Sequence, residues 1–247
     1  MNKLIFSCSL IIFLLFNSAD AYKFHSKRSP LFFFDTAQLT KADILFDSLD
    51  LGKLGLGRRA YDYAMLGYKV LKAKGKLSND NILSIADMSL PSGKKRFFVI
   101  DVKNYKLLFV TLVAHGKNTG LDKSLYFSNE PESNKTSVGF YTTLATYSGK
   151  HGYSLRLQGQ EIGFNSNALE RDIVVHSADY VSESVVKSQG YVGRSLGCPA
   201  LSPEIYKQVI EKIKGGSCLF VYGNDASYIT NSKLLKRPVT LERTPVK

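Results

Sequence analysis

Cysteine is scarce in this chain, which contains three cysteines among 247 residues: Cys8, Cys198 and Cys218. Cys8 lies in an apolar N-terminal run that we expect to be removed on export. The two remaining cysteines, Cys198 and Cys218, could form one disulfide or stay as free thiols. Cys218 lies in an apolar run typical of a buried strand, where a free cysteine often fills core space. Cys198 instead lies among glycines and small residues, so we expect it to be a free thiol.

Acidic residues are also few, because 21 Asp and Glu stand against 33 Lys and Arg, for a formal net charge of +12. Such an excess favours polyanionic partners: nucleic acid, anionic lipid or an acidic cell-wall polymer. The basic residues are spread along the chain, without an aromatic RNA-binding motif, a zinc-finger spacing or a basic helix face, which disfavours nucleic acid. We therefore expect acidic wall polymers to be the polyanions that this charge serves.

Long apolar runs are absent beyond the N-terminus. Residues 1–3 are a short basic start, and residues 4–16 form an apolar run shorter than the ~20 residues that a spanning helix needs. Small residues at Ala19 and Ala21 complete an Ala-x-Ala cleavage pattern. The sequence predicts a signal peptide over 1–21 and a protein exported to the periplasm or the cell wall. An uncleaved membrane anchor is the alternative.

The rest of the chain has the composition of a folded protein, with 44% apolar and 22% charged residues. We expect a linker (22–35), a small helical subdomain (36–90), a strand-rich domain (91–231) and a loose basic tail (232–247). Apolar residues recur every three or four positions in two helical stretches of the subdomain, which are bounded by Gly52, Gly55, Gly57 and Gly75. The expected role of these helices is to pack against the strand-rich domain.

Runs of β-branched and aromatic residues predict the strands of that domain. They cover residues 97–102, 107–113, 139–143, 154–157, 173–176 and 218–222, with a hairpin turn at 103–106. One helix is expected between the last two strands, with Ser202 as N-cap, Pro203 in the first helical position and a stop at Gly215 and Gly216. The predicted fold class is therefore α+β, and mostly β.

The chemistry of the sequence centres on His176, which follows three apolar residues, and on Cys198, which lies in a glycine-flanked turn. A cysteine is a strong nucleophile only as a thiolate, and a nearby imidazole can accept its proton. Gly197 permits a sharp turn in which the N–H groups of Gly197 and Cys198 point at a substrate carbonyl as an oxyanion hole. This pattern predicts covalent acyl transfer, with Cys198 as nucleophile and His176 as base.

The spacing leaves open which group orients His176. Asp179 lies three residues further along the chain, and the backbone carbonyl of Ser177 could hold the same tautomer. A metal site built from His115, His151, His176 and a cysteine is a competing use of these residues. The sequence has no HxH, HExxH or CxxC spacing to support it, so we expect neither a metal nor a cofactor.

Five segments occur together and in order: LVAHGKN at 112–118, SVGFY at 137–141, GKHGYSLRL at 149–157, IVVHSADYVS at 173–182 and GRSLGCPAL at 193–201. Over about residues 85 to 225 the chain thereby resembles the catalytic domain of the murein L,D-transpeptidases (YkuD-like), in the subgroup with a GRSxGCPAL-type signature. The resemblance implies that the strand-rich domain is a β-sandwich that acts on peptidoglycan stem peptides.

The resemblance also implies roles for individual residues. Cys198 is the nucleophile, His176 is the base, the Ser177 carbonyl orients the imidazole, and the N–H groups of Gly197 and Cys198 line the oxyanion hole. Enzymes of this family attack the L,D bond after the third stem residue, release D-alanine, and pass the acyl group to an amine of another stem or to water. Carbapenems commonly trap such cysteines.

Two departures from the commoner signature concern substrate binding. Pro199-Ala200 follows the cysteine where a GCxR pattern has an arginine, so we expect Arg194 to supply the positive charge for a substrate carboxylate. Leu196 stands where some relatives have a histidine. The other side chains expected to bind substrate are His151, Arg156 and Ser195.

Three functions follow from these observations. The leading hypothesis is an exported L,D-transpeptidase. The second is an L,D-carboxypeptidase, in which water accepts the same acyl group. The third is a peptidoglycan-binding protein in which Cys198 is inert or disulfide-bonded.

Overall fold

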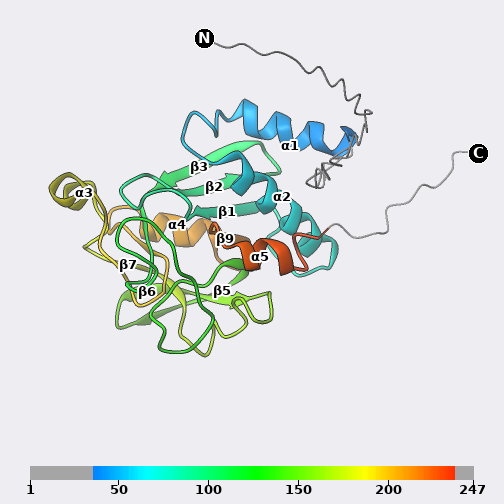
Figure 1. Ribbon diagram of the computed structural model, residues 1–247. Helices are drawn as coiled ribbons and strands as arrows, with labels where there is room; N and C mark the ends of the chain where they lie inside the picture. Colours follow the sequence, from blue (N-terminus) through cyan, green and yellow to red (C-terminus); the bar gives the residue numbers. More distant parts are fainter. Residues whose placement is uncertain (1–35, 237–247) are drawn as a thin grey trace, which may run out of the picture. The chain divides into compact units, whose positions relative to one another are not determined.

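The computed structural model describes residues 36–236, which belong to one compact unit (Figure 1). The predicted signal peptide (1–21), the predicted linker (22–35) and residues 237–247 of the predicted tail lie outside the described residues. No helix within 36–236 combines the length and the apolar character needed to cross a membrane. In chain order the elements are α1 (Thr36–Ser48), α2 (Arg58–Ala73), β1 (Ile82–Asp87), β2 (Phe97–Asp101), β3 (Lys106–Thr111), β4 (Val113–Ala114), β5 (Gly139–Gly149), β6 (Gly152–Gly159), β7 (Val174–Ser177), α3 (Glu183–Gln189), β8 (Ala200–Leu201), α4 (Tyr206–Ile213), β9 (Cys218–Tyr222) and α5 (Ala226–Asn231).

The strands pair in one continuous series, in the order β3-β2-β1-β9-β5-β6-β7-β8-β4. β1 pairs with β9 and β7 with β8 in parallel, and the other neighbours are antiparallel. The prediction of a mostly β fold with a few helices is confirmed. The finer prediction of a two-layered sandwich stays a prediction, because pairing alone gives one nine-stranded sheet.

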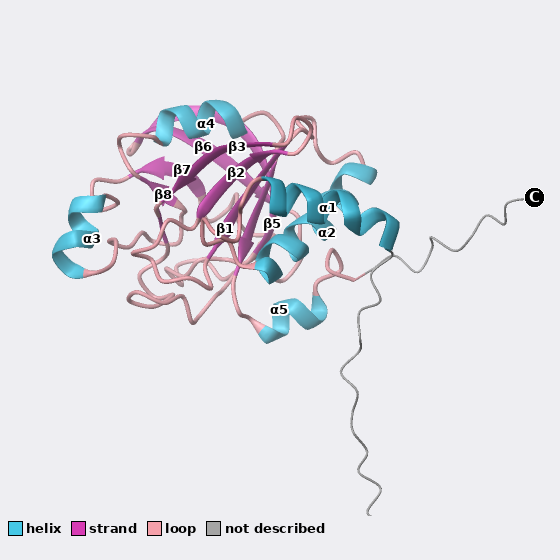
Figure 2. Ribbon diagram, turned by 90° about the horizontal axis from the view of Figure 1, so that it is seen from above, coloured by secondary structure: helices cyan, strands magenta, loops and turns pink. Residues whose placement is uncertain are grey.

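Apolar side chains cover both faces of the sheet, since successive residues of a strand point to opposite faces. Leu83 and Ile85 of β1 join the core formed with α1, α2 and α5, whereas Ile82 and Ala86 join the core formed with α4. Figure 2 shows α4 across the strands from these three helices. Residues of α1 and α2 thus share a core with one face of the sheet.

The first described strand corrects the predicted extent of the helical segment. Residues 82–87 (ILSIAD) are buried throughout and form β1, in the interior of the sheet, instead of belonging to a helical subdomain that reaches residue 90. A short apolar run that is buried on both faces has no period that distinguishes a strand from a helix. The Gly57 N–H donates to the Asp87 carboxylate over 3.1 Å, which ties the start of α2 to the end of β1.

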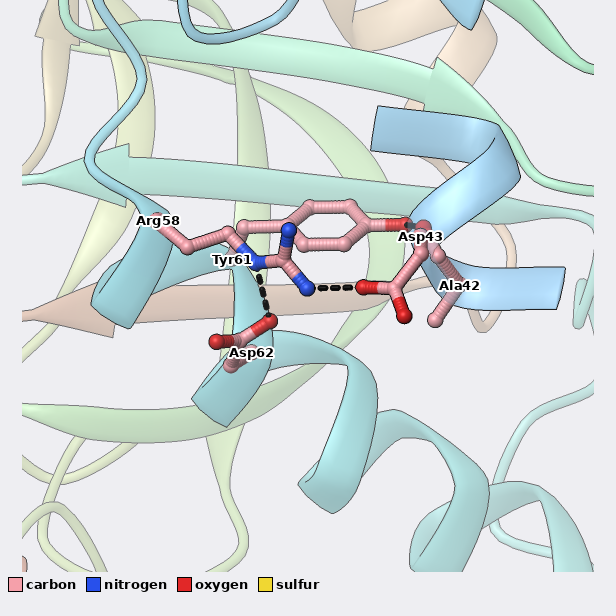
Figure 3. A network of polar contacts seen from close by, with 5 residues as sticks. All are labelled: Ala42, Asp43, Arg58, Tyr61 and Asp62. Carbon is pink, nitrogen blue, oxygen red and sulfur yellow. Dashed lines mark hydrogen bonds and ion pairs between the residues drawn. The ribbon is translucent and has the colours of Figure 1, made fainter. Parts of the chain in front are cut away.

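Polar contacts also join α1 to α2 (Figure 3). The Tyr61 hydroxyl donates to the Ala42 carbonyl over 2.8 Å, although both residues are buried. The Arg58 guanidinium pairs with Asp62 at 2.8 Å and with Asp43 on the other helix. The two helices therefore form one unit, which packs on the sheet through Tyr61, Ala64, Tyr68 and Leu71.

Two further predictions need correction near the C-terminus. The helix expected from Pro203 begins at Tyr206, after a turn whose N–H groups at Ile205 and Tyr206 donate to the Ser202 carbonyl. The Ser202 hydroxyl accepts the Glu204 N–H over 3.4 Å, so it caps this turn. The tail expected to be loose from Ser232 is instead buried at Ser232, Leu234 and Leu235. The Ser232 hydroxyl donates to the buried Glu161 carboxylate, which holds this segment against the core.

Candidate active site

Cys198 lies in the turn that leads into β8, beside the start of β7. His176 is paired with Ala200 in the parallel register of β7 and β8, so Cys198 lies two residues before the residue opposite His176. The Val174 N–H points at Sγ over 3.5 Å, and the thiol donates to the Asp172 carbonyl over 3.5 Å. The sheet thus brings the predicted nucleophile and the predicted base to neighbouring backbones.

Ser195 fixes the conformation of this turn. Its hydroxyl donates to the Cys198 carbonyl over 2.7 Å and accepts the Gly197 N–H over 3.1 Å. Its backbone N–H donates to the His115 carbonyl, and its carbonyl accepts the Lys117 N–H. Ser195 is buried and its hydroxyl is used inside the turn, so its role in substrate binding stays a prediction.

The predicted oxyanion hole is corrected in one of its two donors. Gly197 has the positive φ of 129° that favours glycine, as its place in a sharp turn requires. Its N–H is already bonded to the Ser195 hydroxyl. The Cys198 N–H has no acceptor among residues 36–236, so it is the donor that the turn leaves for a substrate oxygen.

His176 is 4% exposed and lies near the end of β7. Its Nδ1 lies 2.8 Å from the Ser177 carbonyl, which can only accept, so Nδ1 carries the proton and Nε2 keeps its lone pair. Asp179, the other predicted orienting group, is exposed and makes no hydrogen bond to the ring. The structure therefore holds the imidazole in the tautomer that a base at Nε2 needs.

The Cys198 thiol and the His176 imidazole are both uncharged before substrate binds. Burial raises the pKa of the Cys198 thiol, Asp172 adds to the rise, and the Val174 N–H and the Arg171 guanidinium oppose it. Burial lowers the pKa of His176, the hydrogen bond to Ser177 opposes this, and His151 lowers the pKa further. Within the described part of the chain no hydrogen bond joins the imidazole to Sγ, so a thiol and a neutral imidazole face an incoming substrate.

The predicted substrate-binding residues lie in three places. His151, in the turn between β5 and β6, stacks on His176 with ring centroids 4.4 Å apart. Arg156 lies over the Tyr147 ring at 4.3 Å, and its Nη1 is 4.0 Å from the Asp172 carboxylate. Arg194 is exposed and donates to the Lys117 carbonyl over 3.2 Å. His151 thus contacts His176 directly and Arg156 lies beside Asp172, whereas Arg194 is tied to the neighbouring loop.

Both ring nitrogens of the fully buried His115 are hydrogen-bonded within the protein. Its Nδ1 accepts from the Arg96 guanidinium over 2.7 Å, and its Nε2 donates to the Gly120 carbonyl over 3.1 Å. Burial and the Arg96 charge lower the pKa of His115 to about 4. With both ring nitrogens occupied, His115 cannot serve the competing metal site, and residues 36–236 contain no cluster of three His, Cys, Asp or Glu placed to hold a metal.

The disulfide alternative is wrong. Cys198 and Cys218 are both free thiols, and Cys218 lies fully buried on β9 in the core that faces α1 and α2. Burial raises the pKa of the Cys218 thiol far above its usual range. Cys218 is therefore an inert core residue, which makes it a suitable control for experiments on Cys198.

Sequence reasoning missed Arg171, which precedes β7. Its guanidinium donates to the Ser128 and Lys135 carbonyls over 2.8 and 2.7 Å, and also to the hydroxyls of Ser133 and Ser137. No spacing in the sequence points to this residue, because its partners lie between 34 and 43 positions away.

Comparison with known proteins agrees with this geometry. A sequence model of the family described as "L,D-transpeptidase catalytic domain" (YkuD_2) matches residues 53–222. The chain belongs to this family. The resemblance predicted from the sequence is thereby confirmed, and the chain carries an enzyme domain of the L,D-transpeptidase kind.

Solved structures similar to the chain include L,D-transpeptidases from three organisms. That from Mycobacterium smegmatis has 20% identity and a TM-score of 0.37, over 58% of this chain and 59% of that one. That from Stackebrandtia nassauensis has 18% identity and a TM-score of 0.36, over 69% of each chain. That from Mycobacterium tuberculosis H37Rv has 19% identity and a TM-score of 0.33, over 58% of each. The chain thus spans about three fifths of the length of the first of these. No curated protein sequence matches the chain.

Proposed function

We propose that the protein is an exported L,D-transpeptidase that acylates Cys198 with a peptidoglycan stem peptide and passes the acyl group to an amine of a second stem. The observation that carries the proposal is the turn at Cys198, which the Ser195 hydroxyl fixes beside a histidine whose Nε2 lone pair is free. The family assignment gives the reaction class, and the site supplies the residues for it.

The first half-reaction forms a thioester. Sγ attacks the carbonyl carbon of the L,D bond while His176 Nε2 takes the thiol proton. The Cys198 N–H stabilises the negative charge on the carbonyl oxygen, an interaction worth ~3 kcal/mol of barrier in comparable sites. The C–N bond then breaks, and Nε2 returns the proton to the amine of the departing D-amino acid.

The second half-reaction restores the enzyme. The acceptor amine attacks the thioester carbonyl, Nε2 takes a proton from that amine, and the C–S bond breaks as the new C–N bond forms. The proton returns from His176 to the thiolate. Water in place of the amine gives the carboxypeptidase reaction, so the acceptor that reaches the thioester decides between transfer and hydrolysis.

The substrate class rests on charge and on the surroundings of the site. Stem peptides and wall polymers are acidic, and the formal net charge of +12 complements them. His151 stacks on His176, and Arg156 lies beside Asp172, whose carbonyl contacts the thiol; we assign both to stem-peptide binding together with the exposed Arg194. The Ala-x-Ala pattern at 19–21 supports export to the periplasm or cell wall.

The proposal is tested with the purified chain and a disaccharide-tetrapeptide, with products read by mass spectrometry. Cross-linked dimer that depends on Cys198 is expected. Cys218→Ala is the matched control, because it removes the other thiol of residues 36–236 outside the site. Tripeptide with D-alanine alone would overturn transfer in favour of hydrolysis. A Cys198→Ala variant that retains product formation would overturn the role of Cys198.

A further inference from the structure

Arg171 places a positive charge beside the turn that carries Cys198. A Cβ built on Gly197 would lie 3.2 Å from Arg171 Nη2 and 2.9 Å from the Lys135 carbonyl, which itself accepts from Nη2 over 2.7 Å. The residue next to the nucleophile therefore packs directly on the guanidinium and on one of its acceptors. Any larger side chain at Gly197 would displace them.

The guanidinium is held in place by groups that do not neutralise it. Its four hydrogen-bond acceptors are two backbone carbonyls and two serine hydroxyls, all in the segment 128–137. No carboxylate lies within ion-pair distance of Arg171 in the described part of the chain. Glu130 acts on this charge from beyond ion-pair distance, so the oriented guanidinium is available to anions that form near it.

The segment that Arg171 holds also contacts the turn. Thr136 accepts the Gly116 N–H at its hydroxyl over 2.9 Å and donates that hydroxyl to the Gly197 carbonyl over 3.3 Å. Arg171 thereby reaches the turn in two ways, through its own contact with Gly197 and through the 128–137 segment. Arg194, the arginine expected to supply positive charge here, is exposed and donates to the Lys117 carbonyl instead.

We propose that Arg171 is the fixed cation of the nucleophile turn, a positioning residue that stabilises the anionic forms of this site and holds segment 128–137 against it. The anions concerned are the Cys198 thiolate and the oxyanion of the acylation step, so the inference rests on the proposed role of Cys198. Arg171, which precedes β7 in the chain, thus supplies the positive charge that the GCxR pattern has in the arginine after the cysteine.

The charged and titratable groups around Cys198 leave this role to Arg171. Burial and Asp172 disfavour the thiolate, and burial together with the thiolate raises the pKa of the neighbouring Tyr180. Burial lowers the pKa of His176, and Arg156 is directed to the Asp172 carboxylate and the Tyr147 ring. Of the charged side chains near Sγ, the Arg171 guanidinium is the one that lowers the thiol pKa.

The test is alkylation of Cys198 by iodoacetamide as a function of pH, on the full chain in a Cys8→Ala and Cys218→Ala background, so that Cys198 is the remaining thiol. Arg171→Gln removes the positive charge that lowers the thiol pKa, so it is expected to raise the apparent thiol pKa by about one unit. Alkylation below that pKa slows about tenfold. Arg171→Lys keeps the charge and is expected to restore most of the rate. Arg59→Gln is the charge-matched control, because Arg59 is exposed on α2, which packs on the other face of the sheet.

An Arg171→Gln profile that superimposes on the wild-type pH profile would overturn the proposal, whatever happens to the absolute rate. If Arg171→Gln does not fold, the wild type and Arg171→Lys are compared with the anionic reagent iodoacetate. Both should favour iodoacetate over iodoacetamide more strongly than free cysteine does, and the absence of that preference would also overturn it. Alkylation needs no peptidoglycan, so normal alkylation with no turnover of stem peptides would count against the proposed function instead.

Discussion

The imidazole of His151 stacks on that of His176, with ring centroids 4.4 Å apart and planes inclined by 29°. His151 lies in the exposed turn between β5 and β6, whereas His176 is buried at the end of β7. The outer ring therefore covers the inner one, and its charge opposes protonation of His176.

The first prediction concerns this stack. His151→Ala removes both the cover and the charge, so the pKa of His176 rises toward its usual value. The acidic limb of the pH profile of kcat/KM reports the base of the free enzyme, and it should move to higher pH. His151→Phe keeps an apolar cover without the charge and should shift the limb less. Equal profiles for the wild type and His151→Ala would mean that the stack does not influence the base.

The second prediction concerns the nucleophile itself. The family resemblance implies that a carbapenem acylates Cys198, so intact-mass measurement should show one adduct on the wild type. The adduct should persist in Cys218→Ala, because Cys218 is fully buried, and should be lost in Cys198→Ala. An adduct on Cys198→Ala would place the reactive group elsewhere in the chain.

Part of this site could be predicted from the sequence, because its determinants are local. A glycine before a cysteine, and a histidine after an apolar run, indicated the turn and the strand end that the structure shows. Cys218–Tyr222 was predicted to be a strand with the bounds of β9, since β-branched and aromatic residues fill it. The Ser177 carbonyl is adjacent to His176 in sequence, so it was among the expected orienting groups.

The rest depends on contacts that no local pattern carries. The Gly197 N–H is taken by Ser195 because of the way the turn closes, which residue types alone do not determine. Arg171 acquires its environment from a segment more than 30 positions earlier. β1 was missed because its short apolar run suits a buried helix as well as a strand. In each case contacts between distant parts of the chain determined the structure, and the local sequence did not distinguish between the possible structures.

The third prediction tests how the turn is held. Ser195→Ala removes the hydroxyl that bonds both the Cys198 carbonyl and the Gly197 N–H. Two lost hydrogen bonds of this kind cost about 1–3 kcal/mol, so the free energy of unfolding should fall by that amount. Without these two bonds the turn that carries Cys198 is less firmly held. We expect kcat to fall about tenfold or more, since a displacement of 1 Å in a reacting group can cost ~10²-fold.

The control for this variant is Ser188→Ala. Ser188 is exposed on α3, and its hydroxyl donates to the Val185 carbonyl within the same helix. Its removal should leave kcat unchanged. If Ser195→Ala turned over stem peptides at the wild-type rate, the serine hydroxyl would not position the nucleophile, and a stem carboxylate or amide would be the better partner to seek for it.

The fourth prediction concerns stability and pH at His115. Its pKa is about 4 in the folded protein, and its usual value is about 6.5. Between these values the unfolded chain binds a proton and the folded protein does not, so acidification favours unfolding. Burial is the main reason for the low pKa of His115, and the Arg96 guanidinium, which donates to Nδ1, adds to it.

The expected loss between pH 6.5 and 4 is at most about 3 kcal/mol, at ~1.4 kcal/mol for each pKa unit. Burial raises the pKa values of Asp87 and Glu161, so these two carboxyl groups favour the folded protein on acidification and oppose the effect of His115. The quantity to measure is therefore the difference in pH dependence between the wild type and a variant without His115. His115→Gln keeps an acceptor for Arg96 but does not titrate. Urea unfolding followed by circular dichroism should therefore show a smaller fall in the free energy of unfolding for His115→Gln than for the wild type. Equal slopes would show that His115 is already protonated when buried, in which case Arg96 would have to release it.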